Sequence, residues 1–150
     1  MISNGKGKAE ILGDHFESVF TDENVTNISE LPNSNIPDMP SFDIDACGIE
    51  KLLKNINVKK ASGPDEISSW ILKEAASEIA PFLQFIFMQP IKTAEVARDW
   101  KLANVVAIYK KGNKTDASNY RPVSLTSVTC KMLEHIIFHH VMSHLEEHNI

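Results

Sequence analysis

Apolar residues recur at the spacing of α-helices through most of this chain. Intervals of three and four residues predict helices over residues 7–20, 45–56 and 68–79, and from residue 127 to the end. Asp45 is the expected N-cap of the second helix, because a carboxylate can accept a hydrogen bond from the first helical turn. A further helix is expected to begin at Pro81, which suits a first turn, and to be kinked or ended by Pro90.

Two stretches with a period of two predict a β-hairpin. Residues 104–111 form a β-branched strand that places Lys110 and Lys111 on opposite faces. Residues 112–119 are rich in Gly, Asn, Asp and Ser, the usual residues of turns. Residues 120–125 are the expected returning strand, which is short and at an edge because Pro122 cannot donate a hydrogen bond to a sheet.

Two segments interrupt these elements. Residues 21–41 contain many Asn, Pro and Ser residues and only single apolar ones, which indicates a linker or a loosely packed loop. Residues 59–66, "KKASGPDE", contain a Gly-Pro turn. The predicted fold class is therefore α+β and mostly helical, with about five helices and one β-hairpin.

The composition is that of an ordinary globular protein, with 43% hydrophobic and 23% charged residues. No stretch approaches the ~20 apolar residues that a membrane-spanning helix needs, so no membrane partner is expected. The first residues are polar and lack a signal-peptide core, so we expect an intracellular protein of the cytoplasm or nucleus that is not secreted. Cys47 and Cys130 have no paired spacing and are expected to be reduced thiols.

The net charge of −5 hides an uneven distribution. Acidic residues dominate the first fifty positions, whereas residues 101–131 hold six basic side chains and the single acid Asp116. A local basic stripe of this kind is what phosphate recognition requires. Lys110 and Arg121, on the two arms of the hairpin, suit a polyphosphate, because Arg offers a planar fork and Lys a compact charge. Spacing alone favours ordinary solvated cations on a hairpin.

Two further sets of residues could bind a metal. His140, His144 and His148 recur at intervals of four, as do His135 and His139, a spacing at which histidines of a helix can share zinc. No Cys or carboxylate completes such a site, so a polar helix face is the favoured interpretation. Asp43 and Asp45 form a carboxylate pair, but helix capping is the favoured role of Asp45.

The chain contains three sequence blocks in a fixed order: "KKASGPDEI", "WKLANVVAIYKKG" and "NYRPVSLTSVTCKMLEHII". They resemble the fingers region of reverse transcriptases from non-LTR (LINE-like, jockey-type) retrotransposons, and "KAEILGDHFESVF" more weakly resembles the stretch before that polymerase domain. The resemblance implies the fingers portion of a right-hand polymerase. Residues 1–56 would be an N-terminal helical extension and linker, and residues 57–150 a partial reverse transcriptase domain without palm and thumb.

The resemblance also implies roles for hairpin residues. Lys110 and Arg121 match positions that touch the triphosphate of the incoming deoxynucleotide (dNTP). Lys111, Asn119 and Tyr120 lie in the part that would contact the template or its backbone. The Gly63-Pro64-Asp65 turn would be a structural element at the base of the fingers. The family usually has Gly directly after this turn, whereas this chain has Glu66. The position often needs a positive φ angle, which Gly adopts readily.

The family joins a primer 3′-hydroxyl to a nucleotide α-phosphate with two Mg²⁺ ions held by palm aspartates, two of them adjacent. This chain has no Asp-Asp dipeptide. We therefore predict no catalytic residue and no metal ligand here, and a truncated RNA-directed DNA polymerase (a nucleotidyltransferase) that is inactive alone. Mg²⁺, RNA template and DNA primer belong to the complete enzyme. The alternatives are a non-catalytic RNA- or protein-binding module and a functionless relic.

Overall fold

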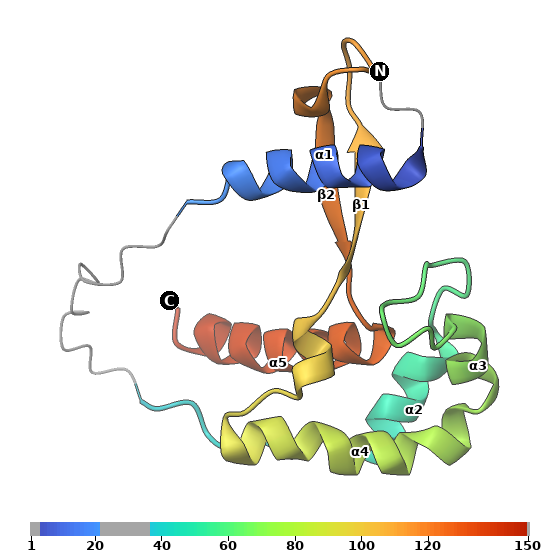
Figure 1. Cartoon of the computed structure of the whole chain (residues 1–150). Helices are drawn as coiled ribbons and strands as arrows, with labels where there is room; N and C mark the ends of the chain where they lie inside the picture. The colour runs from blue at the N-terminus through green and yellow to red at the C-terminus, as the bar shows by residue number, and fades with distance from the viewer. Residues whose placement is uncertain (1–3, 22–36, 150) are drawn as a thin grey trace. The chain divides into compact units, whose positions relative to one another are not determined.

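The computed structural model describes residues 4–21 and 37–149. In these residues it has five α-helices and one two-stranded antiparallel sheet, which confirms the α+β, mostly helical prediction. The helices are α1 (Gly5–Ser18), α2 (Ala46–Lys54), α3 (Ser69–Glu74), α4 (Ala76–Thr93) and α5 (Val128–Glu147). The strands are β1 (Asn104–Tyr109) and β2 (Tyr120–Leu125), and short 3₁₀ helices are η2 (Arg98–Lys101) and η3 (Ala117–Asn119) (Figure 1).

The chain divides into two compact units. Among the described residues, a hairpin unit comprises residues 4–21 and 105–124, and a helical unit comprises residues 37–104 and 125–149. The hairpin unit combines α1 with most of the β-hairpin, and α1 contacts η3 at the hairpin tip. Asn4 caps α1 by accepting a hydrogen bond from the Gly7 amide at 2.8 Å, and Phe16 is the buried residue of this helix.

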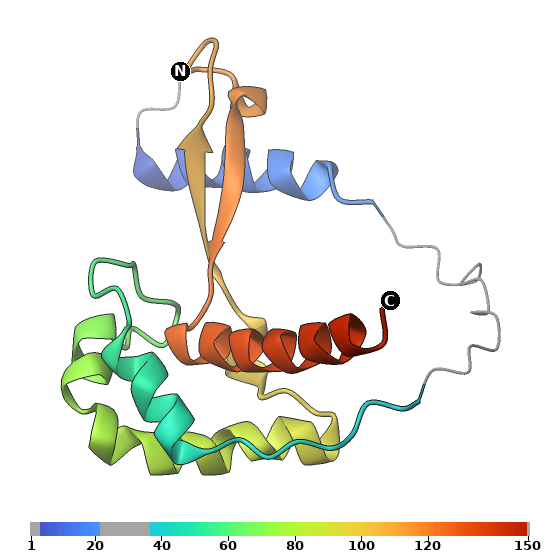
Figure 2. The same cartoon turned by 180° about the vertical axis from the view of Figure 1, so that it is seen from behind.

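The core of the helical unit lies where α2 packs on α4, and α5 lies above α4 (Figures 1 and 2). Ile49 and Leu53 of α2 and Phe87 of α4 are fully buried. The other buried apolar residues of this core are Ile44, Leu72, Ala76, Ala80, Leu83, Met132 and Leu133. The buried residues of α4 recur at intervals of three and four, which is why this segment folds as one long amphipathic helix.

The prediction that a helix begins at Pro81 is wrong. α3 ends at Glu74, and α4 begins at Ala76 and continues through both Pro81 and Pro90. Burial of Ala76 and Ala80 against the core favours a helix that includes the five residues before Pro81. Pro90 lies in the last turn of α4, where the helix ends at Thr93 with Ala94 in the left-handed conformation (φ 56°).

The remaining predictions of local structure differ in their outcome. The N-cap role of Asp45 is confirmed, because its carboxylate accepts a hydrogen bond from the Gly48 amide at 3.1 Å. The 59–66 segment forms turns and no regular element, and Glu66 has the positive φ angle of 55°. Most of the predicted 21–41 linker lies outside the described residues. In the part of the chain that is described, no helix is long and apolar enough to cross a membrane.

Candidate nucleic-acid interface

The register of the hairpin is fixed near its tip. The Lys110 amide donates a hydrogen bond to the Asn119 carbonyl at 2.8 Å, which places these two residues opposite each other. In this register Tyr109 faces Tyr120, and their rings do pack edge to face with centroids 5.6 Å apart. One step further along the strands, Ile108 lies opposite Arg121.

Continuing the alternation of the strands one residue beyond β1 assigns Lys110 and Arg121 to the same face of the hairpin, in diagonal positions on the two arms. Diagonal neighbours on one face of an antiparallel pair lie roughly 7–8 Å apart, within reach of two long side chains that bind one ligand. Both residues are exposed. Neither side chain is in an ion pair with any described residue, so both charges remain available for an anionic ligand.

The first strand is shorter than predicted. β1 ends at Tyr109, and Lys110 and Lys111 begin the tip rather than completing the strand. Lys114 is another exposed cation of the tip, and its Nζ lies 5.5 Å from the centre of the Tyr109 ring, within the range of a cation–π interaction. Together with Arg121 of β2, the three lysines of the tip form a group of four exposed basic residues, Lys110, Lys111, Lys114 and Arg121, which we call the basic tip.

Short-range hydrogen bonds organise the chain between the two strands. Asn113 Oδ1 accepts hydrogen bonds from the Thr115 amide at 3.0 Å and from the Thr115 hydroxyl at 2.9 Å. Asp116 Oδ1 repeats the arrangement two residues later, accepting from the Ser118 amide at 3.0 Å and the Ser118 hydroxyl at 2.7 Å. Two consecutive turns, each closed by an Asn or Asp side chain, therefore shape the tip.

Two tyrosine hydroxyls fasten these turns to the strands. Tyr109, the last residue of β1, donates a hydrogen bond to the Gly112 carbonyl at 2.6 Å. Tyr120, the first residue of β2, donates to the Lys114 carbonyl at 2.9 Å. The role of Tyr109 could not be predicted from the sequence, because its contact depends on the register and on the path of the turn.

The side chain of Asn119 also lies inside the tip. Its Nδ2 donates a hydrogen bond to the Asn113 carbonyl at 3.0 Å. It also packs against Gly112, where φ is +95° and an added Cβ would fall 2.7 Å from Asn119 Oδ1. The side chains of Asn119 and Tyr120 thus hold the tip in shape, while those of Lys110, Lys111 and Arg121 are exposed.

Electrostatics also favour this shape. The Ser118 hydroxyl and the Ser118 amide both donate hydrogen bonds to the Asp116 carboxylate, and these bonds hold the pKa of that carboxyl below its usual value. The hydroxyl has the larger effect of the two. The carboxylate therefore stays charged and bound within the turn, at neutral pH and well below it. It can offset only a part of the four positive charges of the basic tip.

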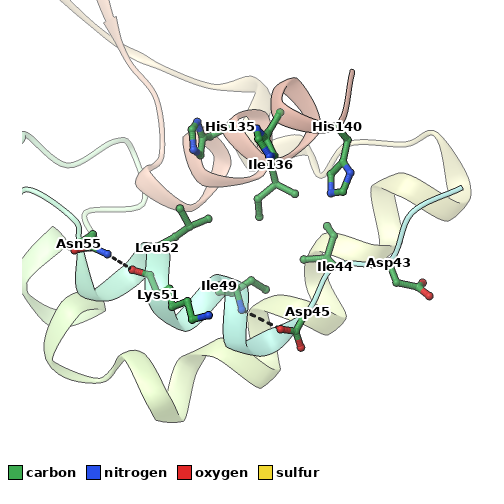
Figure 3. A pocket seen from close by; sticks show the side chains of 12 residues that line it. Asp43, Ile44, Asp45, Ile49, Lys51, Leu52, Asn55, His135, Ile136 and His140 are labelled. Atoms are coloured by element: carbon green, nitrogen blue, oxygen red, sulfur yellow. Dashed lines mark hydrogen bonds between the residues drawn. The ribbon is translucent and has the colours of Figure 1, made fainter. Parts of the chain in front are cut away.

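Three histidines of α5, His135, His139 and His140, line a groove in the helical unit (Figure 3). The groove has a volume of about 490 Å³, and apolar side chains line it from both sides, with Ile49 on α2 and Ile136 on α5. The ring of His140 stacks on Phe42 with centroids 4.0 Å apart. Among the described residues, no three His, Cys, Asp or Glu side chains are grouped so that they could hold a metal ion.

The chain is similar in sequence to RNA-directed DNA polymerases of mobile elements. It is 26% identical over 91% of its length to the RNA-directed DNA polymerase from mobile element jockey of Drosophila melanogaster, and 24% identical over 70% to the corresponding protein of Drosophila funebris. It is 23% identical, over its whole length, to the "Probable RNA-directed DNA polymerase from transposon BS" of Drosophila melanogaster. No protein-family model matches the chain.

These similarities extend over most of the chain but over a small part of each relative. The chain spans 16% of the jockey polymerase of Drosophila melanogaster, 12% of that of Drosophila funebris and 17% of the transposon BS protein. The similarities confirm the resemblance to reverse transcriptases of non-LTR retrotransposons that the "GPDE", "KKG" and "NYRP" blocks indicated. The chain is related to the RNA-directed DNA polymerases of jockey-type and other non-LTR retrotransposons, and it matches only a part of such a polymerase.

Proposed function

We propose that this chain is the fingers portion of a reverse transcriptase, and that Lys110 and Arg121 bind the triphosphate of the incoming dNTP. The observation that carries the proposal is their diagonal placement on one face of the hairpin, exposed and without an ion-pair partner among the described residues. The guanidinium of Arg121 can bind two phosphate oxygens at once, and the ammonium of Lys110 can neutralise a third.

The other hairpin residues have a supporting part in this proposal. Lys111 is exposed at the start of the tip and is suited to a phosphate of the template backbone. Asn119 and Tyr120 use their polar side-chain atoms within the tip, so they position it beside the template. Contact of Asn119 or Tyr120 with the template would use the backbone or the tyrosine ring.

In the complete enzyme the reaction uses an RNA template, a DNA primer and dNTPs inside the cell. Mg²⁺ would there stabilise the attacking and leaving oxygens. In this proposal the contribution of this chain is to bind and orient the nucleotide. We therefore propose that the chain alone polymerises nothing, and a primer-extension assay that detects incorporation would contradict this.

Binding of a dNTP to the isolated chain tests the nucleotide site. We expect weak binding, observed as NMR shift changes at Lys110 and Arg121, that decreases as salt increases. Arg121→Ala and Lys110→Ala should each weaken it about tenfold, because each removes a charge-assisted contact. Lys131→Ala, which removes an exposed lysine of α5, is the matched control and should have no effect. Equal binding by Arg121→Ala and the wild type would overturn the proposal.

The four cations of the basic tip also support a second candidate function, a non-catalytic RNA-binding module. Such a module would bind single-stranded RNA in a strongly salt-dependent way, because cations that contact phosphates release counterions. It would bind RNA through Lys111 and Lys114 as well as Arg121, and it would not bind a free dNTP. RNA binding that is lost in Lys111→Ala and Lys114→Ala, combined with no dNTP binding, would favour the module over the fingers.

A further inference from the structure

Helix α4 exposes two phenylalanines on the side that faces away from its core. Phe82 is 71% exposed and Phe85 is 70% exposed, whereas Leu83 and Phe87 of the same helix are buried. The outward face of a surface helix is normally polar. Figures 1 and 2 both show α5 above α4, and no described element of the helical unit below it. An apolar stripe on α4 is therefore without a partner among the described residues of this unit.

The exposed residues of this face follow a regular pattern. Five exposed residues follow one another along α4 at intervals of four, three, four and three positions. They are Glu78, Phe82, Phe85, Gln89 and Lys92. This alternation is the heptad spacing of residues that line the seam between two paired helices. We call these five residues the α4 seam. Its centre is apolar, and its two ends carry opposite charges.

We propose that the α4 seam pairs with the α4 seam of a second copy of this chain, in antiparallel orientation about a two-fold axis at Phe85. Glu78 and Lys92 each lie seven residues from Phe85, on opposite sides. Antiparallel pairing therefore places Glu78 of each copy opposite Lys92 of the other, and the attraction occurs twice. Parallel pairing would instead place Glu78 against Glu78. The charge pattern thus selects a self-complementary, two-fold interface.

The charged ends of the seam are exposed, and the charge nearest to Glu78 on a neighbouring helix is that of Lys54 in α2, which forms its own ion pair with Glu50. Glu78 Oε2 accepts a hydrogen bond from the Ser77 hydroxyl at 2.9 Å, on the same helix, which leaves the other oxygen free of any hydrogen bond among the described residues. Lys92 is exposed and has no ion-pair partner among the described residues. Ile86, which is 43% exposed, widens the apolar centre on one side.

The seam offers a small area for a dimer interface. A buried aromatic side chain covers about 150–250 Å², so four phenylalanines at the exposures given above would contribute roughly 600 Å². Stable specific interfaces bury about 1,200–2,000 Å² in total. The stems of Lys92 and Gln89 and the side chain of Ile86 add area, but the sum stays near the lower limit. We therefore expect a weak dimer that forms in the micromolar range and dissociates on dilution.

Sedimentation velocity of the whole chain across the micromolar range tests the surface. The wild-type chain should shift from monomer to dimer as its concentration rises, and Phe85→Glu should remain monomeric. Phe138→Glu is the matched control, because Phe138 is a phenylalanine of α5 with 61% exposure that lies outside the seam. It should dimerise like the wild type. A chain that stays monomeric throughout, or a Phe85→Glu variant that still dimerises, would overturn the proposal.

A charge exchange tests the orientation and excludes misfolding as the cause. Glu78→Lys and Lys92→Glu should each weaken the dimer at least about tenfold, because each places like charges opposite one another. The double variant restores both attractive pairs and should dimerise as the wild type does. If the double variant stays as weak as either single variant, the antiparallel pairing is wrong. Circular dichroism and thermal melting of each variant verify that the monomer is folded.

Discussion

Gly63 lies directly against the backbone of Ser127. A Cβ atom on Gly63 would fall 2.4 Å from the Ser127 nitrogen and 2.6 Å from the Thr126 carbonyl carbon. Ser127 is the N-cap of α5, and its hydroxyl accepts a hydrogen bond from the Cys130 amide at 3.4 Å. The Gly-Pro turn therefore sits on the N-terminus of α5, where only a residue without a side chain fits.

Gly63→Ala should destabilise the helical unit. The new methyl group would clash with backbone atoms, which cannot move aside as a flexible side chain can, so we expect a loss of about 2 kcal/mol or more in the free energy of unfolding. Urea denaturation measures it. Gly48→Ala is the control, because the site in α2 has open space and alanine favours helix. A Gly63→Ala variant as stable as Gly48→Ala would contradict the close contact.

Glu66 occupies the left-handed region with φ of 55°, three residues after Gly63. This conformation costs a residue with a side chain roughly 1–2 kcal/mol, and glycine adopts it freely. Glu66→Gly should therefore raise the free energy of unfolding by up to about 1 kcal/mol, after the greater flexibility of glycine in the unfolded chain is subtracted. Glu66→Ala removes the charge but keeps the strain, and should gain much less. Equal gains in the two variants would assign the effect to charge.

Local patterns predicted the hairpin and the start of α2, but not the boundary between α3 and α4. The hairpin followed from the period of two in residues 104–111 and 120–125, and the N-cap of α2 followed from Asp45. Periodicity could not place the start of α4, because Pro81 is a good first-turn residue and the burial of Ala76 depends on α2. Nor could it show which phenylalanines of α4 are buried. Phe85 and Phe87 belong to one apolar run, and only packing separates the exposed one from the buried one.

The candidate site could be predicted only in part. The residue types of the tip indicated turns, and the alternation of the strands placed Lys110 and Arg121 on the two arms. The hydrogen bonds from Tyr109 and Tyr120 to carbonyls of the tip join residues three and six positions apart, across a turn whose path the sequence does not specify. The resemblance implies that Asn119 and Tyr120 lie near the template, but it could not show that their polar side-chain atoms are used within the tip.

Protonation of Asp116 should loosen the tip at acid pH. Its folded-state pKa is lowered by the Ser118 hydroxyl and amide, so the carboxylate contributes stability above its unfolded pKa and loses it as pH falls through the lowered value. NMR titration of the carboxyl carbon should show this low pKa. Ser118→Ala removes the hydroxyl donor and should raise the pKa towards the ordinary value, whereas Ser124→Ala on β2 should not. An unchanged pKa in Ser118→Ala would contradict the assignment.

The two cysteines should differ strongly in reactivity. Burial raises the pKa of the Cys130 thiol to about 11, and a hydrogen bond from its Sγ to Glu134 Oε1 at 3.5 Å adds to this effect. Because the thiolate is the nucleophile, Cys130 should resist alkylation near neutral pH, while the exposed Cys47 reacts. Mass spectrometry after timed iodoacetamide treatment measures both sites. Equal alkylation rates at Cys47 and Cys130 in the folded chain would show that the Cys130 thiol is not shielded.

The same shift predicts how stability depends on alkaline pH. As pH rises from about 9 towards about 11, the unfolded chain loses the Cys130 proton while the folded chain keeps it, so the free energy of unfolding should fall. Glu134→Gln removes the neighbouring negative charge, so it should lower the pKa of the thiol and reduce this fall. Glu146→Gln, which alters another acid of α5, serves as the control.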